Sequence, residues 1–446
     1  MTLRFGTDGV RGVANAELTP ELVLALGRAA ARVLGGGPFL VGRDTRVSGP
    51  LLQAALSAGL ATEGADVVDL GVLPTPGVAW LSAADARPAA VISASHNPFP
   101  DNGVKFFQAG GRKLSDETEA ALEAELDRLL AHPAAEERRT GAGLGRLLAG
   151  GGHARYEQAL AASIGGRSLA GLSVVLDCAN GAASEVAPAV LRALGAEVAV
   201  LHDAPDGLNI NDRCGSTHPE ELQRAVVALR ADAGLAFDGD ADRVLAVDHT
   251  GALVDGDQLI AICALDRRAH GRLAGDAVVV TVMTNLGFRQ AMAGEGIRVI
   301  ETDVGDRYVL EEMERGGWSL GGEQSGHVIF GDLATTGDGA LTGLQVLDVV
   351  VRTGRSLADL AAVMVRLPQV LRNVPVASRG AGVQASEELV MAVKAVEADL
   401  GDRGRVLVRP SGTEAVVRVM VEAMTVQEAE AACDTLCDAV GRSLGA

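Results

Sequence analysis

Short runs of β-branched and other apolar residues alternate with amphipathic stretches along most of the chain. Thr19 followed by Pro20 places a helix-capping residue before a first-turn proline, which predicts a helix running toward Leu34. The other elements predicted in the first third are strands at Pro38–Val41, Asp66–Leu70 and Ala89–Ile92 and a helix at Leu51–Leu60. This alternation predicts an α/β fold with mostly parallel strands.

The alternation then restarts twice. The further predicted strands are Ser173–Leu176, Glu197–Leu201, Ala277–Val282 and Arg298–Glu301, with a helix inside each pair. We therefore expect three similar α/β domains with mixed or parallel sheets, at residues 1–152, 153–253 and 254–366. The glycine-rich stretch Gly141–Gly152 is the best candidate for a linker.

The C-terminal stretch has a different pattern. Its predicted elements are strands at Leu367–Val376, Arg405–Val408 and Ala415–Glu422 and a helix at Ser386–Leu400. Thr425 and Glu428 have the spacing of a capping box that opens a final helix. This order predicts a separate α+β domain at 367–446, and we expect all four domains to face one central cleft.

Composition and charge narrow the class of protein. With 446 residues, 48% of them hydrophobic, the chain can form several cores. A formal net charge of −19 repels nucleic acid and anionic lipid, so we expect neither as a partner. No apolar run approaches the roughly 18 residues of a membrane span. The N-terminus lacks a secretory h-region and the five cysteines are an odd number, so we expect a cytoplasmic protein with reduced thiols.

The loop Ser93–Pro98 directly follows a predicted strand. It is not the elbow of an α/β-hydrolase, because Ser93 and Asn97 stand where glycines are needed. A plain turn and a reactive hydroxyl of Ser95 beside His96 are the two interpretations. Asp101–Gly103 is predicted to form a tight turn that leads to Lys105. A serine, a histidine and a lysine together suit nucleophilic or phosphoryl chemistry.

Three carboxylates alternate along a second loop, Asp238, Asp240 and Asp242. Crowding three negative charges costs energy unless a cation lies among them. The loop fails the calcium EF-hand pattern, because Arg243 and His249 replace the required Gly and Glu, and its oxygen ligands suit Mg²⁺. A solvated acidic turn is the alternative, which the apolar runs on both sides disfavour.

Two more loops carry polar groups of other kinds. Arg409–Glu414 offers hydroxyls, a glycine and backbone N–H groups that suit an anion, and Arg418 adds a guanidinium from the next strand. A simple turn between strands is the alternative. Gly321–His327 offers the carboxylate of Glu323 and the hydroxyl of Ser325, which suit the hydroxyls or the amine of a sugar but fit a scaffold loop equally well.

Two glycine-flanked stretches are also polar where a scaffold does not require it. Phe5–Gly12 contains Asp8 and Arg11, and Gly42–Arg46 contains Asp44. For each, a functional loop and a structural ion pair stay open. No P-loop is present, so a nucleoside triphosphate is not indicated as phosphate donor. Together the loops favour phosphoryl transfer from a phosphoserine, which needs positioning and charge neutralisation more than covalent groups.

The motifs SASHNP, DNGVK, DGDADR, GEQSGH and RPSGTE, in this order, resemble the signature loops of the α-D-phosphohexomutases. The resemblance covers essentially the whole chain. It implies that Ser95 carries the phosphate, and that one Mg²⁺ binds to the phosphoserine and the three aspartates. The other roles that it implies are acid and base for Lys105 and His96, contact with the transferred phosphate for Arg11 and Arg243, contact with the sugar for Glu323 and Ser325, and grip on the substrate's own phosphate for Arg409, Ser411, Gly412, Thr413 and Arg418.

The opening FGTDGVRG and the form GEQSGH resemble most closely the family members that act on glucosamine phosphates. This implies an isomerase that interconverts glucosamine 6-phosphate and glucosamine 1-phosphate, with glucosamine or glucose 1,6-bisphosphate as intermediate or activator. The product would feed UDP-N-acetylglucosamine and cell-wall synthesis, and the enzyme would be a monomer or homodimer.

Other functions remain as alternatives. The first is a mutase of mannose and glucose phosphates. An aspartyl phosphatase is disfavoured because the D-x-D-x-T form is missing, and a catalytically dead sugar-phosphate sensor is disfavoured because Ser95 and the three aspartates are intact.

Overall fold

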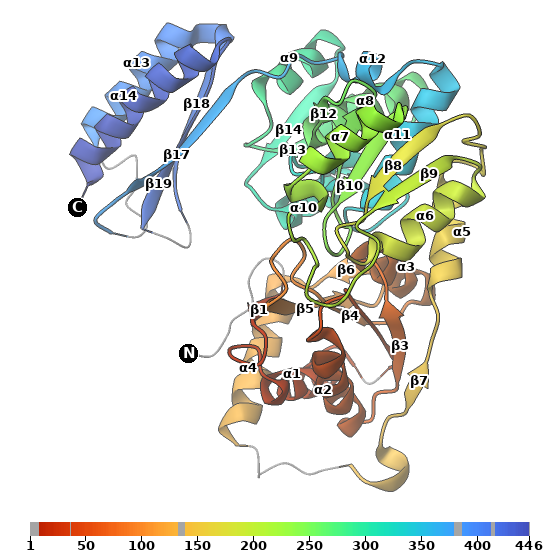
Figure 1. Ribbon diagram of the computed structural model, residues 1–446. Coiled ribbons are helices and arrows are strands. Elements are labelled where there is room, and N and C mark those ends of the chain that lie inside the picture. The colour runs from red at the N-terminus through yellow and green to blue at the C-terminus, as the bar shows by residue number, and fades with distance from the viewer. Residues whose placement is uncertain (1–8, 36, 133–138, 379–385, 412–414, 446) are drawn as a thin grey trace. The chain divides into compact units, whose positions relative to one another are not determined.

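The computed structural model describes residues 9–35, 37–132, 139–378, 386–411 and 415–445 (Figure 1). The chain divides into two compact units. The first comprises the residues up to Met283 together with Arg298–Val363, and the second comprises Thr284–Ile297 together with Met364–Ala446. No described helix is long and apolar enough to cross a membrane.

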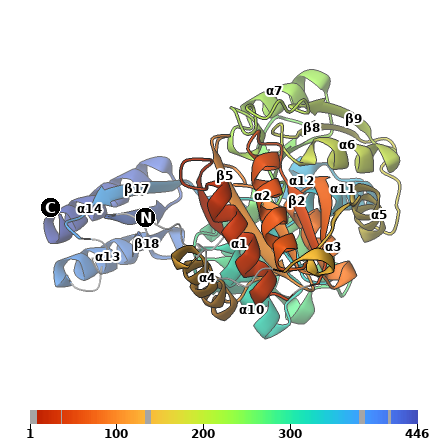
Figure 2. The ribbon, with the colours of Figure 1, turned by 90° about the horizontal axis from the view of Figure 1, so that it is seen from below.

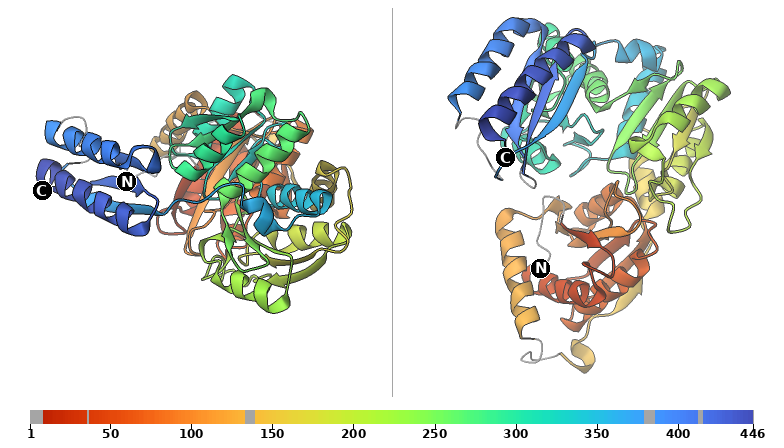
Figure 3. Two further views of the ribbon diagram at one scale, coloured as in Figure 1. Left: turned by 90° about the horizontal axis from the view of Figure 1, so that it is seen from above. Right: turned by 60° about the vertical axis from the view of Figure 1, so that its left-hand side comes forward.

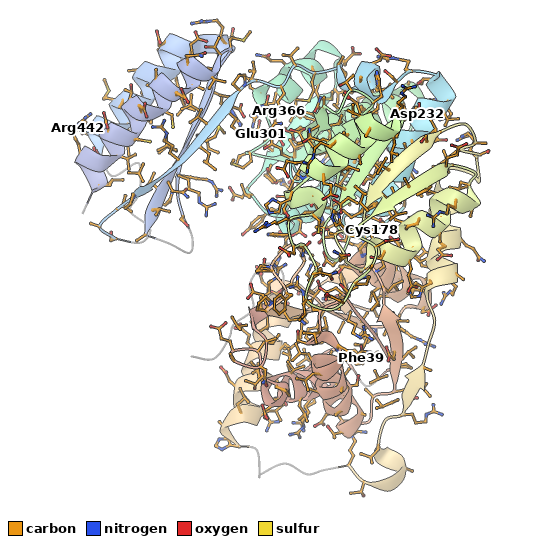
Figure 4. The ribbon with its side chains drawn as sticks, viewed as in Figure 1. Phe39, Cys178, Asp232, Glu301, Arg366 and Arg442 are labelled. Atoms are coloured by element: carbon orange, nitrogen blue, oxygen red, sulfur yellow. The ribbon has the colours of Figure 1, made fainter. Side chains whose placement is uncertain are left out.

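The first sheet of the first unit has the strand order β1-β5-β4-β2-β3-β7, with β6 paired to β5. Its strands are β1 Val10–Val13, β2 Phe39–Arg43, β3 Val67–Val72, β4 Ala89–Ile92, β5 Asp101–Gln108, β6 Arg112–Lys113 and β7 Leu147–Ala149. Its helices are α1 Pro20–Val33, α2 Gly49–Thr62, α3 Thr75–Asp85 and α4 Asp116–Ala131, and η1 Gly141–Gly143 is a 3₁₀ turn. Phe39 on β2, labelled in Figure 4, is fully buried in the core that this sheet shares with α1, α2 and α4.

Helices α1 and α2 lie side by side on this sheet (Figure 2). They cross closely because each has a glycine at the contact. A Cβ on Gly27 would lie 2.4 Å from the carbonyl oxygen of Leu56, and one on Gly59 would lie 2.1 Å from that of Leu24. Any larger residue would separate the helices, so the close packing of α1 against α2 depends on these two glycines.

The second sheet has the order β12-β11-β10-β8-β9. Its elements are α5 His153–Ser163, β8 Ser173–Asp177, α6 Ala183–Ala193, β9 Glu197–Leu201, η2 Gly215–Thr217, α7 Glu220–Leu229, β10 Ala233–Phe237, β11 Val244–Asp248 and β12 Leu253–Val254. Strands β8, β9 and β10 are parallel, whereas β11 runs antiparallel to β10. All five residues of β10 are buried, which is typical of a strand covered on both faces.

The third sheet has the order β14-β13-β15-β16. The elements of the first unit in this part of the chain are α8 Gly256–Ala269, η3 Ala274–Asp276, β13 Ala277–Thr281, β14 Arg298–Thr302, α10 Asp306–Gly316, β15 Leu320–Gly322, β16 Val328–Phe330, α11 Gly339–Thr353 and α12 Leu357–Ala361. Helix α9, Leu286–Gly294, follows β13 in the sequence but belongs to the second unit. Strands β13, β14 and β15 are parallel, and β16 is antiparallel to β15.

The three sheets share one topology. Each contains the same group of four strands, in which the first of the four lies between the second and the third and the fourth runs antiparallel beside the third: β5-β4-β2-β3, β11-β10-β8-β9 and β16-β15-β13-β14. This confirms the prediction of three similar α/β layers. The loop between the third and fourth strands therefore has an equivalent place in all three.

The second unit contains an antiparallel sheet in the order β17-β19-β18. Its elements are β17 Gln369–Pro375, α13 Glu387–Leu400, η5 Gly401–Arg403, β18 Arg405–Pro410, β19 Val416–Glu422 and α14 Val426–Leu444. The two long helices pack together on one face of the sheet, drawn in blue in Figure 3. The predicted α+β character of this region is confirmed.

Two local predictions were wrong, and a third was half right. Asp101–Gly103 does not form a turn but begins β5, because these residues pair with Arg11–Val13 of β1. The expected linker Gly141–Gly152 contains β7, which extends the first sheet beyond β3. Thr425 caps α14 by accepting from the Glu428 N–H, but the Glu428 carboxylate accepts from the Thr425 hydroxyl. The domain limits 1–152, 153–253, 254–366 and 367–446 stay predictions.

Candidate active site

Three of the polar loops singled out in the sequence occupy the equivalent place in the three sheets. The Ser95 loop joins β4 to β5, the aspartate loop joins β10 to β11, and the Glu323 loop joins β15 to β16. Each leaves the carboxyl end of a parallel strand, where ligands collect in α/β folds. The first and second loops meet directly, because a Cβ on Gly239 would lie 2.6 Å from the Ser95 carbonyl oxygen.

Ser95 is buried and has a left-handed backbone with φ 50°, an unusual conformation for a residue with a Cβ. Its Oγ donates a hydrogen bond of 2.6 Å to Asp238 Oδ2. On its other side, Oγ lies 3.3 Å from Nδ1 of His96. The hydroxyl that the sequence singled out is thus held between a carboxylate and an imidazole.

Asp238, Asp240 and Asp242 are all buried, and one oxygen of each lies within 4.8 Å of the others. Burial, together with the charges of Asp242 and Asp240, raises the pKa of Asp238 well above its ordinary value. Burial also acts to raise the pKa of Asp242, but the charge of Lys105 and contact with His327 hold it well below the ordinary value. Among the described residues, Oδ1 of Asp240 and Oδ1 of Asp242 have no hydrogen-bond partner.

The chemistry of this triad fits a hard divalent cation. Carboxylate oxygens are the ligands that Mg²⁺ takes in proteins, and buried acceptors without a donor are costly unless an ion binds them. A cation here would also remove the repulsion that raises the pKa of Asp238. The residues present therefore fit Mg²⁺, with the Ser95 oxygen close enough to Asp238 to take part.

Lys105 on β5 is the one described lysine that reaches this triad. Its Nζ lies 2.8 Å from Asp240 Oδ2 and 3.6 Å from Asp242 Oδ2, and it is only 4% exposed. The Thr75 hydroxyl at the start of α3 donates to the same Asp240 oxygen at 2.7 Å. β5 thus brings the ammonium beside the carboxylates, although by a strand and not by the expected turn.

His96 is half-buried among positive charges. Its Nδ1 lies 3.2 Å from Nη1 of Arg243. Burial first, then the charges of Arg243 and Arg11, lower the pKa of His96. The imidazole is therefore neutral near pH 7 and can accept a proton. The same two guanidinium groups make this side of the site suited to a phosphate dianion.

The third loop is tied to the second. Glu323 Oε1 accepts a 3.1 Å hydrogen bond from the Gly305 N–H at the start of α10, and burial raises the pKa of Glu323. The buried ring of His327 accepts from the Gly337 N–H at Nε2, which leaves Nδ1 facing Asp242 Oδ1 at 3.8 Å. Ser325 is exposed at the tip of this loop.

The fourth loop belongs to the second unit. Arg409 of β18 lies directly opposite Arg418 of β19 in the antiparallel register, and both are partly buried. Two guanidinium groups on neighbouring strands offer donors that suit an anion. Ser411 is buried, and its N–H donates to the Val416 carbonyl at 2.9 Å. Gly412 and Thr413 lie outside the described residues.

Sequence reasoning missed several groups around the site. Thr75 at the start of α3 and Asn211 in a loop belong to no recognisable motif, and Asn211 Nδ2 donates to the carbonyl oxygens of Ser95 and Asn97. His327 stood inside a noted motif without a role. The Gly42–Arg46 stretch proves to contain a structural ion pair, in which Arg46 Nε lies 2.8 Å from Asp44 Oδ2 and both side chains are buried.

A second group of metal-ligating types lies at the end of β8 and comprises Asp177, the last residue of that strand, with His202 and Cys214. The Asp177 carboxylate already accepts hydrogen bonds from the Ala179 and Gly215 N–H groups. It also lies 3.1 Å from His202 Nδ1. The neighbouring Cys178, labelled in Figure 4, is fully buried and stays thiol because burial raises its pKa. We assign no ion to this group.

Comparison with known proteins gives one consistent result. Family models described as phosphoglucomutase/phosphomannomutase match in four parts, alpha/beta/alpha domain I at residues 2–132, domain II at 154–251, domain III at 255–367 and the C-terminal domain at 371–439. The chain is 55% identical over 446 residues to the phosphoglucosamine mutase of Salinispora arenicola and 54% identical over 444 residues to that of Rhodococcus jostii, covering 98% of each chain and of its own length.

A solved structure shares the fold over the full length. The N-acetylphosphoglucosamine mutase of Aspergillus fumigatus, in complex with GlcNAc-6P and magnesium, superposes with a TM-score of 0.72 at 20% identity. The match covers 99% of this chain and 96% of that one.

Proposed function

The chain belongs to the phosphoglucosamine mutase family of α-D-phosphohexomutases, and on that premise we propose that it interconverts glucosamine 6-phosphate and glucosamine 1-phosphate through a phosphate carried on Ser95. Members of this family are isomerases. The observation that supports the mechanism best is the buried Ser95 hydroxyl, bonded to Asp238 at the edge of the three-carboxylate group.

Asp238, Asp240 and Asp242 would hold one Mg²⁺ together with an oxygen of the phosphorylated Ser95. When bound, the ion neutralises charge on the phosphate and so lowers the barrier to its transfer. Two observations support this proposal: the orphaned buried oxygens of Asp240 and Asp242, and the magnesium in the related Aspergillus protein.

The first half-reaction moves the phosphate from Ser95 to the free hydroxyl of the sugar phosphate. The bond between phosphorus and Ser95 Oγ breaks, a bond to the sugar oxygen forms, and the sugar hydroxyl loses a proton as Oγ gains one. Lys105 and His96 would carry these protons; the proximity of His96 Nδ1 to Ser95 Oγ and of the Lys105 ammonium to the carboxylates supports these roles. The resulting 1,6-bisphosphate returns its other phosphate to Ser95 in the second half-reaction, and glucosamine or glucose 1,6-bisphosphate would load an empty enzyme.

The remaining residues bind and orient the sugar phosphate. Arg11 and Arg243 would neutralise the phosphate in transfer, because their charges also lower the pKa of His96, which lies beside Ser95. Glu323 and Ser325 would bind the sugar's hydroxyls or amine. The residues proposed to hold the phosphate that is not transferred are Arg409, Ser411, Gly412, Thr413 and Arg418. The facing positions of Arg409 and Arg418 on β18 and β19 support that role, because two neighbouring guanidinium groups can both donate to one phosphate.

The setting is proposed as well. We infer a cytoplasmic enzyme, monomer or homodimer, whose product supplies UDP-N-acetylglucosamine for the cell wall. The four matched family domains support the division at 1–152, 153–253, 254–366 and 367–446.

The test is a substrate panel on the purified full chain. Glucosamine, glucose and mannose 6-phosphates are supplied with Mg²⁺ and a trace of glucose 1,6-bisphosphate, and formation of each 1-phosphate is followed by ³¹P NMR. We expect the highest kcat/KM for glucosamine 6-phosphate, and intact mass with peptide mapping should place one phosphate on the peptide containing Ser95. A higher kcat/KM for glucose or mannose 6-phosphate would establish the alternative mutase instead.

A further inference from the structure

The guanidinium of Arg46 is surrounded by backbone carbonyls of the Ser95 loop. Nη2 donates to the carbonyl oxygens of Ser95 at 2.9 Å and Asn97 at 2.8 Å. Nη1 donates to those of Pro98 and Asp101, the latter at 3.0 Å. One buried side chain therefore binds four carbonyls, three in the loop after β4 and one on the first residue of β5. Arg46 itself is only 1% exposed.

Asp44 holds the other side of the same arrangement. Its Oδ2 accepts from Arg46 Nε at 2.8 Å and from the Ser93 hydroxyl at 2.6 Å. The Ser93 oxygen in turn accepts from the Ser95 N–H at 2.9 Å. Both backbone polar groups of Ser95 thus lead to Asp44, the N–H through Ser93 and the C=O through Arg46.

This arrangement accounts for the left-handed conformation of Ser95. A residue with a Cβ keeps a φ of 50° only where its surroundings fix it. Asn211 adds a further donor to the Ser95 carbonyl at 2.9 Å. With the backbone held on both sides, the remaining freedom of Ser95 is the rotation of its side chain, which directs Oγ at Asp238.

We propose that Arg46 is a positioning residue for phosphoryl transfer: its guanidinium fixes the loop so that Ser95 Oγ keeps one place whether or not it carries phosphate. The proposal rests on the function proposed above and deepens it. Arg46 touches no reacting atom, because its described partners are backbone carbonyls and Asp44. A planar guanidinium with five donors can bind several carbonyls at once, whereas a lysine ammonium is a single point with three donors. Misplacing a reacting group by about 1 Å can cost roughly 10²-fold in rate.

Arg46→Lys is the primary test. It keeps the positive charge and the pairing with Asp44, but it loses the planar guanidinium whose two terminal nitrogens bind the four carbonyls. We expect kcat to fall roughly 10- to 100-fold, with the KM for glucosamine 6-phosphate changed less than about threefold. Amide hydrogen exchange of the peptide spanning residues 93–101 should become faster. The matched control is Arg267→Lys on α8. Like Arg46, Arg267 is buried, being 2% exposed, and it forms an ion pair, with Nη2 at 2.7 Å from Asp332 Oδ1.

The control separates positioning from general stability. An equal fall in kcat in the Arg267 variant, or an unchanged kcat in a folded Arg46→Lys enzyme, would overturn the proposal. If Arg46→Lys does not fold, Ser93→Ala decides, because it removes only the hydroxyl between Asp44 and the Ser95 N–H. A fall in its kcat of about tenfold at constant KM supports positioning, and a wild-type kcat contradicts it.

The two proposals fail in different ways. If the wild-type enzyme is active and the Arg46 and Ser93 variants have the same kcat, the mutase function is supported and the positioning role is contradicted. A wild-type chain without mutase activity, or without phosphate on Ser95, overturns the proposed function and with it this inference.

Discussion

The Ser95 loop and the aspartate loop have the same place in equivalent sheets, yet the protein treats them in opposite ways. The first is held by protein groups alone, since Arg46 binds four of its carbonyls and Ser93 binds the Ser95 N–H. The second has three buried carboxylates, and Oδ1 of Asp240 and Oδ1 of Asp242 accept no hydrogen bond from the described residues. One loop is thus fixed by donors of the protein itself, while its counterpart gathers carboxylates whose chemistry fits a cation.

Ser95→Ala tests the loop that protein groups hold, and we expect it to lower activity more than any other substitution considered. Only the hydroxyl is lost, so the loop keeps its backbone contacts while turnover falls by more than about 10³-fold. Mutase activity and intact mass measure the result, with loss of the single phosphate. Ser115→Ala, at the exposed start of α4, should keep activity. A Ser95→Ala enzyme with a normal rate would remove the phosphoserine mechanism.

Asp240→Asn tests the incomplete side. Removing one ligand charge should weaken Mg²⁺ binding and slow transfer roughly 10²-fold, since the ion neutralises the phosphate during transfer. Activity is titrated with Mg²⁺ after treatment with a chelator. Mg²⁺ should also raise the melting temperature of the wild type by mass action, and less so for the variant. Asp276→Asn, an exposed carboxylate, is the control. Full activity of Asp240→Asn without metal would contradict the ion site.

Asp338 can be compared with the three aspartates of the second loop, because it is also a buried carboxylate but accepts hydrogen bonds from protein donors. It accepts from the Tyr156 hydroxyl and the Leu341 N–H, yet burial raises its pKa to about 6. Since this exceeds the unfolded value, the stability it contributes is present below about pH 4 and lost as the pH rises through about 6. Asp338→Asn should therefore gain up to about 3 kcal/mol relative to wild type between pH 4 and pH 7.

The control for Asp338 is a carboxylate whose pKa shifts in the opposite direction. The pKa of exposed Asp359 is lowered by hydrogen bonds from Ser356. Asp359→Asn should therefore lose stability relative to wild type as the pH rises. Urea unfolding at several pH values gives both differences. Parallel pH profiles for the two variants would mean that Asp338 does not titrate as described.

Arg409→Ala has the smallest expected effect, because it removes binding that is remote from the reacting hydroxyl. We expect the KM for glucosamine 6-phosphate to rise roughly tenfold with a smaller fall in kcat. Steady-state kinetics measure both constants. Arg442→Ala on α14, an exposed arginine labelled in Figure 4, should leave them unchanged. An unaltered KM for the Arg409 variant would argue against a phosphate site on β18 and β19.

Local patterns were sufficient for much of the fold. Strands β4 and β9 have the predicted bounds, because each is a short apolar or β-branched run between clear breakers. The Ser95 and aspartate loops were found because their polar residues directly follow such strands. The family resemblance then supplied roles that spacing alone did not, such as the sugar contact of Glu323.

Long-range contacts explain what the sequence could not reveal. Asp101–Gly103 has turn composition, but pairing with β1 overrides that local preference. The role of Arg46 depends on carbonyl oxygens far along the chain, and every residue type has a carbonyl, so no motif marks them. Asn211 likewise comes from a separate loop whose path brings it to Ser95.

The antiparallel fourth strand of each sheet has a consequence for how such an enzyme can change. Because that strand returns beside the third, each loop is anchored at both ends by neighbouring hydrogen-bonded strands. Insertions at one tip therefore leave the strand order of the sheet unchanged, whereas side chains at the three tips are coupled, since Ser95 contacts Asp238 and His327 faces Asp242. A change at one tip would then be tolerated only if it keeps its contacts with the others.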